Sequence, residues 1–471
     1  MSTVAVLGGG IAGLTSAFFL SRLSLPSVSK IVVIEGSNRL GGWIQTEHLK
    51  DGTILEGGPR SFRYGGKAEA KVLELVEMLD LKDEIVTVSN EKMRRRFFID
   101  GAVKEFPKDF DKWKILKTTM KGLLKDRWVV KPMEDESVES FLYKRFGGSR
   151  EIMGISDAMF RGIFASSISD ISYKFSLFGK SGCNSMIELQ QQMKLIKEEL
   201  KKHDSELVRR ATEEKWQIWN LRRGTGQLVE GLAEALLKDP RVEIKMDTPC
   251  QSMELDSTSA TLRSSDSDIL KAEHVISTVL SKNLGSMLPA EHEELSDFLC
   301  RIPAVSVIVV NVVYDQDLEE VPQGFGHLLP SFEDPPVLGV VYDSRVFPDH
   351  GPINTTRLTV MMGGAWMKEL KDRVGSLNDE SLIKLTKEVL HKHLNITASP
   401  AHIKVRYQMD CIPLHAVGHN KLLKCIYSYI NEHQLPLTLS GCSYREIGVT
   451  GIINDSFQQV LTLQQHLAEK S

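Results

Sequence analysis

Residues 4–13 read VAVLGGGIAG, an apolar strand that runs directly into a glycine-rich turn and then into a helix. Gly8 permits the tight turn, Gly10 lets the backbone approach a pyrophosphate, and Gly13 allows close packing of helix on strand. The first turn of the helix offers free N–H groups and the positive end of its dipole to a phosphate. The stretch therefore predicts a dinucleotide-binding unit of the Rossmann type.

A second apolar strand, residues 31–34, ends in Glu35, at about the spacing of an acid that hydrogen-bonds a ribose hydroxyl. Such an acid favours an adenosine ribose without a 2′-phosphate. The alternative is a glycine-rich turn that binds nothing, but it does not explain why strand, glycines, helix and acid occur together. We therefore expect a dinucleotide with an unphosphorylated ribose.

Further glycine turns narrow the dinucleotide to FAD. Residues 39–43, RLGGW, follow the second strand; the paired glycines can press against a cofactor, and Arg39 can offset pyrophosphate charge. Another turn, EGGPR, occupies residues 56–60. Simple NAD dehydrogenases do not need these contacts, whereas the long, buried FAD does. The competing interpretation of Arg39 is a solvated surface side chain.

The composition is that of an ordinary globular protein. The 471 residues suggest two to four structural units, and 42% hydrophobic with 25% charged residues is typical of a soluble chain. A net charge of −4 gives no argument for nucleic-acid binding. The six cysteines form no C-x-x-C pair, which argues against a disulfide scaffold and against a bound metal.

No segment predicts a membrane-spanning helix. The longest apolar run, residues 302–314, contains a proline and falls short of the roughly 20 residues that a span needs, so it is predicted to be a buried strand. Three residues precede the first strand, too few for a cleaved targeting peptide. We expect any organelle address within the folded chain, and any membrane attachment to be peripheral or monotopic.

The order of the motifs predicts a chain that leaves its cofactor domain and returns to it twice. Short strands near residues 242–244, 260–262 and 274–278 are interpreted as the first return of the sheet, and a strand–glycine–helix unit from residue 437 as the second. The expected fold class is α/β, a Rossmann-type FAD-binding domain with an α+β substrate domain and an inserted helical membrane-binding domain. The predicted boundaries are 1–91, 206–290 and 411–471 for FAD binding, 92–205 for the helical insertion and 291–410 for substrate binding.

An ordered set of motifs then carries a family resemblance. After the opening turn come GPR at 58–60, QGFGHL at 323–328, VVYDS at 340–344, VMMGG at 360–364 and LTL at 437–439. Together, and from end to end, they resemble the protoporphyrinogen oxidases of animals, which belong to the FAD-dependent amine oxidase superfamily. No single motif carries this resemblance.

The resemblance implies non-covalent FAD and the stepwise oxidation of protoporphyrinogen IX to protoporphyrin IX by O2, with release of peroxide, the penultimate step of haem biosynthesis. It implies a homodimer, monotopic on the intermembrane-space side of the mitochondrial inner membrane, with ferrochelatase as a candidate partner. The flavin carries the redox chemistry, so no catalytic side chain is predicted.

The resemblance also assigns site residues. Phe325, Gly326, Leu328 and Met361 line the macrocycle, and Arg96 pairs with a propionate. The competing interpretations are core residues for Leu328 and Met361, and a solvated charge run for Arg96. The expected FAD contacts are Gly8, Gly9, Gly10, Ile11, Ala12, Gly13, Glu35, Arg39, Gly42, Trp43, Gly58, Pro59, Arg60, Ser61, Cys250, Cys442, Ile447, Gly448 and Val449.

An amphipathic segment, residues 108–131, combines lysines with apolar side chains at helical spacing. A basic face opposite an apolar face suits an anionic membrane surface. The alternative is a helix that docks on its own protein, and the resemblance favours the membrane. The apolar residues are Phe110, Trp113, Leu116, Met120, Leu123 and Leu124.

Two alternative functions remain open. One is an amine or carotenoid-type flavin oxidase of the same fold, although aromatic residues that would flank a flavin in an amine site are sparse near residue 440. The other is a prenyl-binding carrier related to GDP-dissociation inhibitors, which shares the glycine fingerprint but holds no flavin. Bound flavin separates the carrier from both oxidases, and the substrate separates the oxidases from each other.

Overall fold

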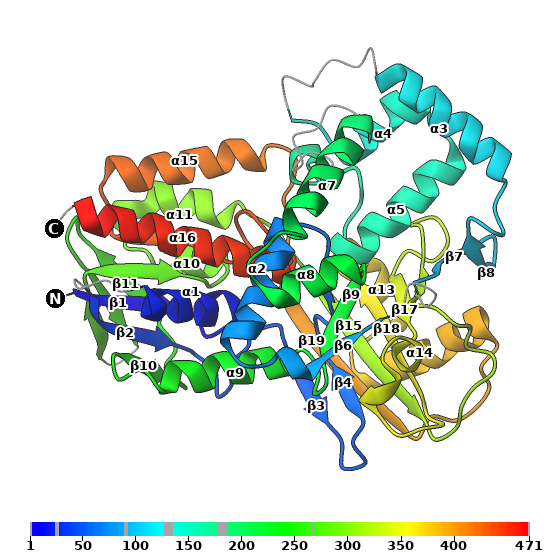
Figure 1. Ribbon diagram of the computed structural model, residues 1–471, viewed down its shortest axis with the longest axis horizontal. Helices are drawn as coiled ribbons and strands as arrows, with labels where there is room; N and C mark the ends of the chain where they lie inside the picture. The colour runs from blue at the N-terminus through cyan, green and yellow to red at the C-terminus, as the bar shows by residue number, and fades with distance from the viewer. Residues whose placement is uncertain are drawn as a thin grey trace.

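Two lobes make up the protein, as the computed structural model shows (Figure 1). Both chain ends lie at the far end of the lobe built on a parallel sheet, and a larger sheet with its own helices forms the other lobe. The structure describes residues 2–23, 28–88, 93–126, 135–176, 186–264 and 267–469.

The parallel-sheet lobe contains five strands in the order β10-β2-β1-β14-β20, all parallel to their neighbours. The chain leaves this sheet after its second strand and comes back for three more, so the predicted Rossmann-type α/β fold and the repeated return of the chain to this sheet are confirmed. The bounds are β1 (Ser2–Leu7), β2 (Val28–Ile34), β10 (Val242–Lys245), β14 (His274–Ser277) and β20 (Leu437–Leu439).

One strand interpreted as part of this return lies elsewhere. The segment near 260–262 is β12 (Ala260–Arg263), which pairs antiparallel with β11 (Ser252–Leu255) and β13 (Asp268–Ala272) in a separate sheet. Its residues alternate between buried and half-buried, as in a sheet with one covered face, whereas β1 and β14 are almost wholly buried. The interpretation of this strand was therefore wrong.

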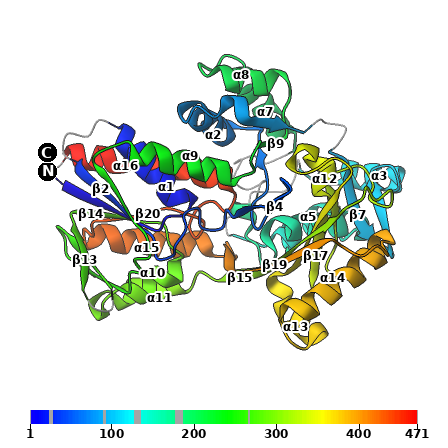
Figure 2. The ribbon, with the colours of Figure 1, turned by 90° about the horizontal axis from the view of Figure 1, so that it is seen from below.

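Helices cover both faces of the parallel sheet (Figure 2). Val4 and Val6 point into the core shared with α1 (Ile11–Arg22), α9 (Gly226–Leu237) and α16 (Val449–Glu469). Ala5 and Leu7 point to the opposite core, against the small antiparallel sheet and three other helices. Those helices are α10 (Ser281–Met287), α11 (Glu293–Cys300) and α15 (His419–Glu432).

The second lobe is built on a seven-stranded sheet in the order β19-β15-β18-β17-β16-β7-β8. Its long central strand β15 confirms that residues 302–314 form a buried strand rather than a helix. Strands β7 and β8 come from the segment assigned to the helical insertion, yet they complete one edge of this sheet. The bounds are β7 (Arg95–Ile99), β8 (Ala102–Phe106), β15 (Ala304–Tyr314), β16 (Gly326–Leu328), β17 (Val337–Val341), β18 (Thr356–Gly363) and β19 (His402–Pro413).

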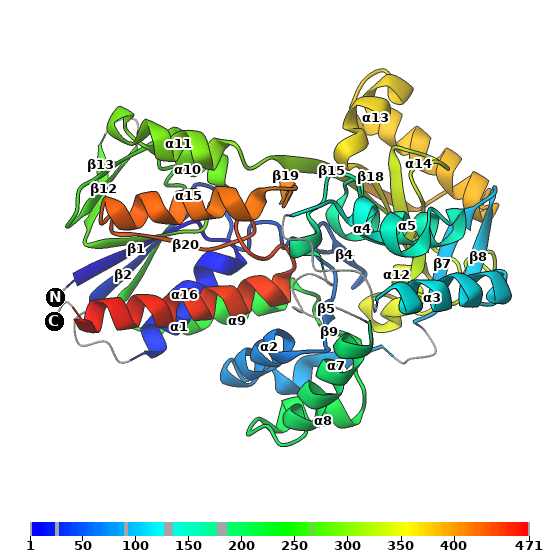
Figure 3. The same ribbon diagram turned by 90° about the horizontal axis from the view of Figure 1, so that it is seen from above.

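Different helices pack on the two faces of the seven-stranded sheet. Helices α13 (Met367–Val374) and α14 (Asp379–Leu394) pack on one face, and α5 (Arg150–Phe164) contacts β16 and β17 on the other. Figure 3 places α13 and α14 on one side of the lobe and α3 on the opposite side. The remaining elements are β3 (Thr46–His48), β4 (Ile54–Glu56), β5 (Phe62–Arg63), α2 (Lys67–Met78), β6 (Ile85–Thr87), α3 (Lys112–Asp126), α4 (Val138–Phe146), α7 (Met186–Leu200), α8 (Glu206–Glu213), β9 (Ile218–Leu221) and α12 (Asp343–Val346).

A buried histidine pair lies under the α14 face of the sheet. The Nδ1 atom of His327 is 2.7 Å from the hydroxyl of Tyr342, and its Nε2 is 3.0 Å from Nδ1 of His393. The ring of His393 stacks on Phe98 with the centroids 3.9 Å apart. Burial lowers the pKa of His327 well below its usual range and that of His393 to about 3. Both imidazoles are therefore neutral at pH 7.

This pair predicts loss of stability on mild acidification. Because the unfolded chain binds protons near pH 6.5 and the folded histidines do not, each should cost about 1.4 kcal/mol of unfolding free energy per pH unit below that value. Chemical denaturation at pH 7, 6 and 5 measures the loss. His393→Gln should reduce the slope by about one proton, while the same change at exposed His48 should leave it unaltered. Equal slopes in all three proteins would contradict this prediction.

Candidate functional site

The first glycine turn has the geometry that its sequence predicts. Gly8 has a φ of +107°, and a Cβ on Gly13 would lie 1.9 Å from the carbonyl oxygen of Gly8. Gly10 differs, because a Cβ there would contact only Gly42, whose Cα is 3.7 Å away. Nothing in the described part of the chain requires glycine at position 10. The space in front of it, beside the first N–H groups of α1, fits a pyrophosphate.

The loop after the second strand is fastened to this turn. The N–H of Gly41 donates to the carbonyl of Gly9 over 2.9 Å, and the Glu35 carboxylate accepts from the N–H of Gly9 over 2.7 Å. Arg39 is exposed and donates to carbonyls of its own loop, including that of Gly42 at 2.6 Å. Arg39 therefore shapes the loop, and its contact with pyrophosphate stays a prediction.

The last return of the chain joins the same place. A Cβ on Gly441 would lie 3.7 Å from the Cβ of Ala12, so the turn after β20 lies against the start of α1. Gly448, just before α16, has open space where a side chain would be. Burial raises the pKa of the Cys442 thiol to about 11. A protonated thiol is a poor nucleophile, which agrees with a cofactor held without a covalent bond to this residue.

The predicted FAD contacts in residues 8–13, 35–42 and 442–449 therefore lie near the carboxyl ends of β1, β2, β14 and β20, where α/β sheets bind their ligands. Arg39 and Gly448 are exposed, and Gly9, Ile11, Ala12, Gly13 and Cys250 are buried. Half-buried, with part of each residue accessible, are Gly8, Gly10, Glu35, Gly42, Trp43, Gly58, Pro59, Arg60, Ser61, Cys442, Ile447 and Val449.

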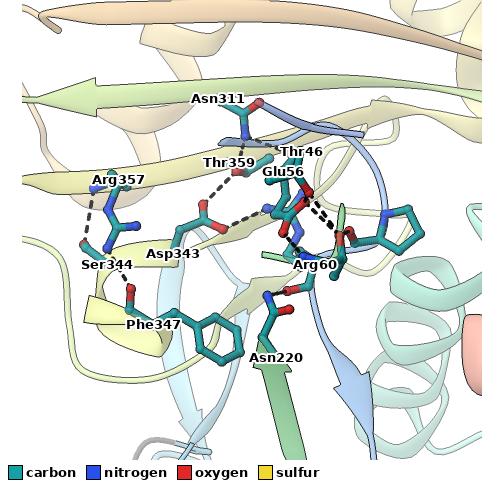
Figure 4. Close-up of polar contacts among 12 residues, drawn as sticks. Thr46, Glu56, Arg60, Asn220, Asn311, Asp343, Ser344, Phe347, Arg357 and Thr359 are labelled. Carbon is teal, nitrogen blue, oxygen red and sulfur yellow. Dashed lines mark hydrogen bonds and ion pairs between the residues drawn. The ribbon is translucent and has the colours of Figure 1, made fainter. Parts of the chain in front are cut away.

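A buried carboxylate holds the second glycine turn in place. Glu56 accepts hydrogen bonds from Thr46 Oγ1 at 2.7 Å and from the N–H and hydroxyl of Thr225 at 2.7 and 2.9 Å (Figure 4). Burial raises the pKa of Glu56, while the three hydrogen bonds counteract that rise. Glu56 thus ties the turn that follows β4 to the start of α9.

A polar network then joins this turn to the seven-stranded sheet (Figure 4). Nη1 of Arg60 is 2.9 Å from Oδ1 of Asp343, and Oδ2 of Asp343 accepts from the hydroxyl of Thr359 at 2.7 Å. The Thr359 oxygen accepts in turn from Nδ2 of Asn311 at 2.8 Å. Sequence reasoning missed Asp343 and Asn311. The VVYDS motif contains Asp343, but no spacing rule links it to a residue so distant in the chain.

Two of the predicted macrocycle residues, Leu328 and Met361, lie on one face of the sheet, whereas Phe325 packs in a separate cluster with Val346 and Phe347. Leu328 is in register with Gly339, and Gly339 with Met361, so these residues share one face of the sheet. A Cβ on Gly162 of α5 would lie 2.7 Å from Cδ2 of Leu328, which identifies this as the α5 face. Leu328, Met361 and Phe325 are all half-buried. Partial exposure beside wholly buried neighbours favours a lined site over the interpretation of ordinary core residues.

Arg96 lies on the opposite face. It is in register with His327 and faces α14, where its guanidinium donates to the Glu105 carboxylate at 2.7 Å and to the carbonyl of Gln323. The solvated-charge interpretation does not hold for Arg96, which is buried, although Arg94 is exposed. The structure does not bring Arg96 to Leu328, because side chains alternate between faces along β7.

The neighbouring arginine occupies the face that Arg96 does not. Arg95 is in register with Gly326 and shares the α5 face with Leu328. Desolvation and the like charge of the exposed Arg95 lower the pKa of Arg63, and the Glu69 carboxylate counteracts that shift. Apart from this interaction of Arg63 with Glu69, neither guanidinium has a hydrogen bond or ion pair to a residue within the described part of the chain.

Comparisons with known proteins find relatives that match almost the whole chain. Curated protoporphyrinogen oxidases from Macaca fascicularis and Bos taurus are 34% and 35% identical to this chain, covering 98% and 97% of it and the same shares of their own lengths. A crystal structure of a protein from Exiguobacterium sp. 255-15 superposes with a TM-score of 0.79 at 20% identity, over 99% of both chains. The model of the flavin containing amine oxidoreductases matches residues 11–446. The chain belongs to that family.

Proposed function

We propose that the protein is an FAD-dependent oxidase that converts protoporphyrinogen IX to protoporphyrin IX with O2 as electron acceptor. The observation that carries this proposal is the similarity to two protoporphyrinogen oxidases along almost the whole chain. The open glycine cradle supports it, because it leaves room for a dinucleotide where the sequence predicts one. This reaction supplies the porphyrin from which haem is made.

The protein's part in this reaction is to bind and to orient. The cradle around Gly10 and the N-terminus of α1 would hold the pyrophosphate, and Glu35 would face the adenosine ribose. The turn at residues 57–61 would hold the flavin end against the seven-stranded sheet. FAD supplies the acceptor for the electrons of the substrate. The half-buried apolar surface of Leu328 and Met361 would receive the macrocycle and exclude water from it.

An aerobic assay tests the function directly. The purified protein should absorb near roughly 450 nm from its flavin, and protoporphyrinogen should produce porphyrin fluorescence under air. Gly10→Val is the matched control. A Cβ at this position meets only Gly42, at ordinary contact distance, whereas the branched side chain should displace the pyrophosphate, so the variant should fold, lack flavin and be inactive. A flavoprotein that oxidises a polyamine and not the porphyrinogen would contradict the proposed substrate. A folded wild-type protein without flavin would indicate the alternative function, a prenyl-binding carrier.

The propionates of the substrate provide a second test, because the adjacent residues Arg95 and Arg96 lie on opposite faces of the seven-stranded sheet. We expect the accessible pair Arg95 and Arg63 to hold a propionate, in place of the Arg96 that sequence reasoning selected. Arg95→Gln should raise KM for the porphyrinogen about tenfold, equivalent to about 1.4 kcal/mol of binding. Arg96→Gln removes the 2.7 Å ion pair of the buried Arg96 with the half-buried Glu105, so it should lower the melting temperature with little change in KM. The reverse pattern would restore Arg96 as the propionate residue.

We further propose that helix α3 attaches the protein to an anionic membrane surface. Its apolar side chains Trp113, Leu116 and Met120 are 81%, 49% and 55% exposed, so the described part of the chain leaves about half or more of each uncovered. Phe110 does pack inward, edge-on to Phe97. The side chains of Leu123 and Leu124 lie outside the described residues. No helix in the described ranges is long and apolar enough to cross a bilayer.

Cosedimentation with anionic liposomes tests this attachment. Replacing Trp113, Leu116 and Met120 together by serine should reduce binding at least tenfold and leave oxidase activity in detergent unchanged. The same number of substitutions at Ile353, Leu237 and Met78, which are exposed on other elements, serves as the control. Unchanged binding of the α3 variant would contradict the proposal.

We extend the membrane proposal to a homodimer on the intermembrane-space side of the mitochondrial inner membrane that passes product to ferrochelatase.

A further inference from the structure

Two buried histidines at the start of α15 hold the loop that follows β20. Nε2 of His415 is 3.1 Å from the carbonyl oxygen of Cys442, and Nε2 of His419 is 2.8 Å from that of Tyr444. A carbonyl oxygen can only accept a hydrogen bond, so Nε2 of each imidazole carries the hydrogen. The two histidines are 1% and 4% exposed. The loop is therefore held by two directional donors that are largely closed to water.

Strand β20 does not hold this loop alone. It has three residues and lies at one edge of the parallel sheet, beside β14. After it, the N–H of Ser440 donates to the carbonyl of Ser277 at the end of β14 over 3.0 Å. The hydroxyl of Ser443 accepts from the N–H of Ser281 at the start of α10, also over 3.0 Å. The histidines add contacts from α15, so the loop is held by three separate elements.

A phenylalanine from the segment assigned to the helical insertion fixes the two imidazole rings. The rings of His415 and His419 stack with their centroids 4.4 Å apart and their planes at 17°. The ring of Phe175 meets both edge-on, with centroid distances of 4.9 and 4.7 Å. Such edge-to-face contacts favour one relative orientation of the rings. The Nε2–H groups therefore stay directed at their two carbonyl oxygens.

The main chain around the histidines is bound to the same segment. The N–H of Ser172 donates to the carbonyl of His415 over 2.9 Å. The Asp135 carboxylate accepts from the hydroxyl of Ser172 at 2.8 Å and from the N–H of Gly418, just before α15, at 3.0 Å. Figure 3 shows that this end of α15 faces the other lobe. The histidine pair thus lies between the helical segment and the loop after β20.

The loop that receives these hydrogen bonds belongs to the cofactor cradle. A Cβ on Gly441 would lie 3.7 Å from the Cβ of Ala12, at the start of α1. Cys442 is half-buried between two buried neighbours, so part of the loop is accessible. Residues 447–449, which follow directly, are accessible as well and are predicted FAD contacts. A displacement of residues 442–444 would therefore displace the surface that the cofactor is predicted to contact.

We propose that His415 and His419 are positioning residues that hold residues 442–444 in the conformation that binds FAD, with Phe175 keeping their rings in place. The inference rests on the proposed function only in requiring FAD at this site. A loop that is already fixed loses less conformational entropy when the cofactor binds, so the affinity is higher. The histidines act through the loop, with no contact of their own to the cofactor or substrate.

The dissociation constant for FAD tests this role, measured from flavin fluorescence as the purified holoprotein is diluted. Asparagine is too short to place a donor where Nε2 lies, so His415→Asn and His419→Asn should each raise the Kd about fivefold, the effect of one lost hydrogen bond. Glutamine places its amide N–H near the position of Nε2. His415→Gln and His419→Gln should therefore keep the Kd within about twofold of the wild type.

Two further variants complete the test. His292→Leu is the matched control, because it removes a buried histidine whose Nδ1 is 3.1 Å from the hydroxyl of Tyr429, toward the opposite end of α15. It should lower the melting temperature and leave the Kd for FAD unchanged. Phe175→Leu removes only the edge-on ring; it should raise the Kd at least about twofold, and it decides the matter should the asparagine variants not fold.

Three results would overturn the proposal. One is an unchanged Kd in the folded asparagine variants, or in Phe175→Leu. Another is an equal loss of affinity in the asparagine and glutamine variants, which would indicate packing of the rings rather than their hydrogen bonds. The third is a similar loss in His292→Leu, which would indicate a general effect of stability.

The outcome is independent of the substrate assignment, because FAD release is measured without porphyrinogen. A wild-type protein that binds FAD but does not oxidise protoporphyrinogen would refute the proposed function and leave this test intact. Normal turnover of protoporphyrinogen together with an unchanged Kd in the asparagine variants would refute the positioning role alone.

Discussion

The close approach of Gly13 to the carbonyl of Gly8 is the contact on which the cofactor lobe depends. At 1.9 Å from that oxygen, no Cβ could occupy position 13, so helix α1 can cross β1 at this distance only with glycine there. The contact fixes where α1 begins and where its first N–H groups point. Thr278 reinforces it from the neighbouring strand, donating its hydroxyl to the carbonyl of Leu7 at 2.9 Å. The ends of β1 and β14 thereby meet at the start of α1.

The two lobes are joined by directional polar contacts rather than by packing alone. Arg406 of β19 donates to Glu47 at 2.5 Å, and Gln408 donates to the carbonyl of Gly57 at 2.7 Å. Together with the polar network of Arg60, Asp343, Thr359 and Asn311, these contacts fix the position of residues 57–61 relative to the seven-stranded sheet. Hydrogen bonds at such a junction specify one geometry, because displacement would leave buried polar atoms unsatisfied.

Local patterns in the sequence predicted the parts of this protein that depend on neighbours in the chain. The glycine turn, the buried strands β1 and β15 and the return of the sheet all follow from spacing and periodicity within short windows. Arg96 illustrates what such patterns miss. Its face on the sheet is decided by pairing with His327, more than two hundred residues away in the chain, and a register of one residue exchanges its environment with that of Arg95.

The polar network that joins Arg60, Asp343, Thr359 and Asn311 could not be predicted from the sequence for the same reason. Its members come from four separate segments, and their types are common in proteins. The motif containing Asp343 could be recognised as part of a family pattern, but only the fold shows that its carboxylate faces Arg60. The prediction for β12 was wrong for a different reason: the sequence of a four-residue strand does not indicate which sheet the strand joins.

Leu328 lies between two glycines, Gly162 of α5 and Gly339 of β17. Helix and sheet backbones are thus separated here by the thickness of a single leucine side chain. The width of the proposed macrocycle site at this point is a property of the main chain, which no rotamer change can enlarge. An aromatic residue at position 328 would be thicker than this leucine and would press on α5, and a methyl group added at position 162 would have to displace the Leu328 side chain.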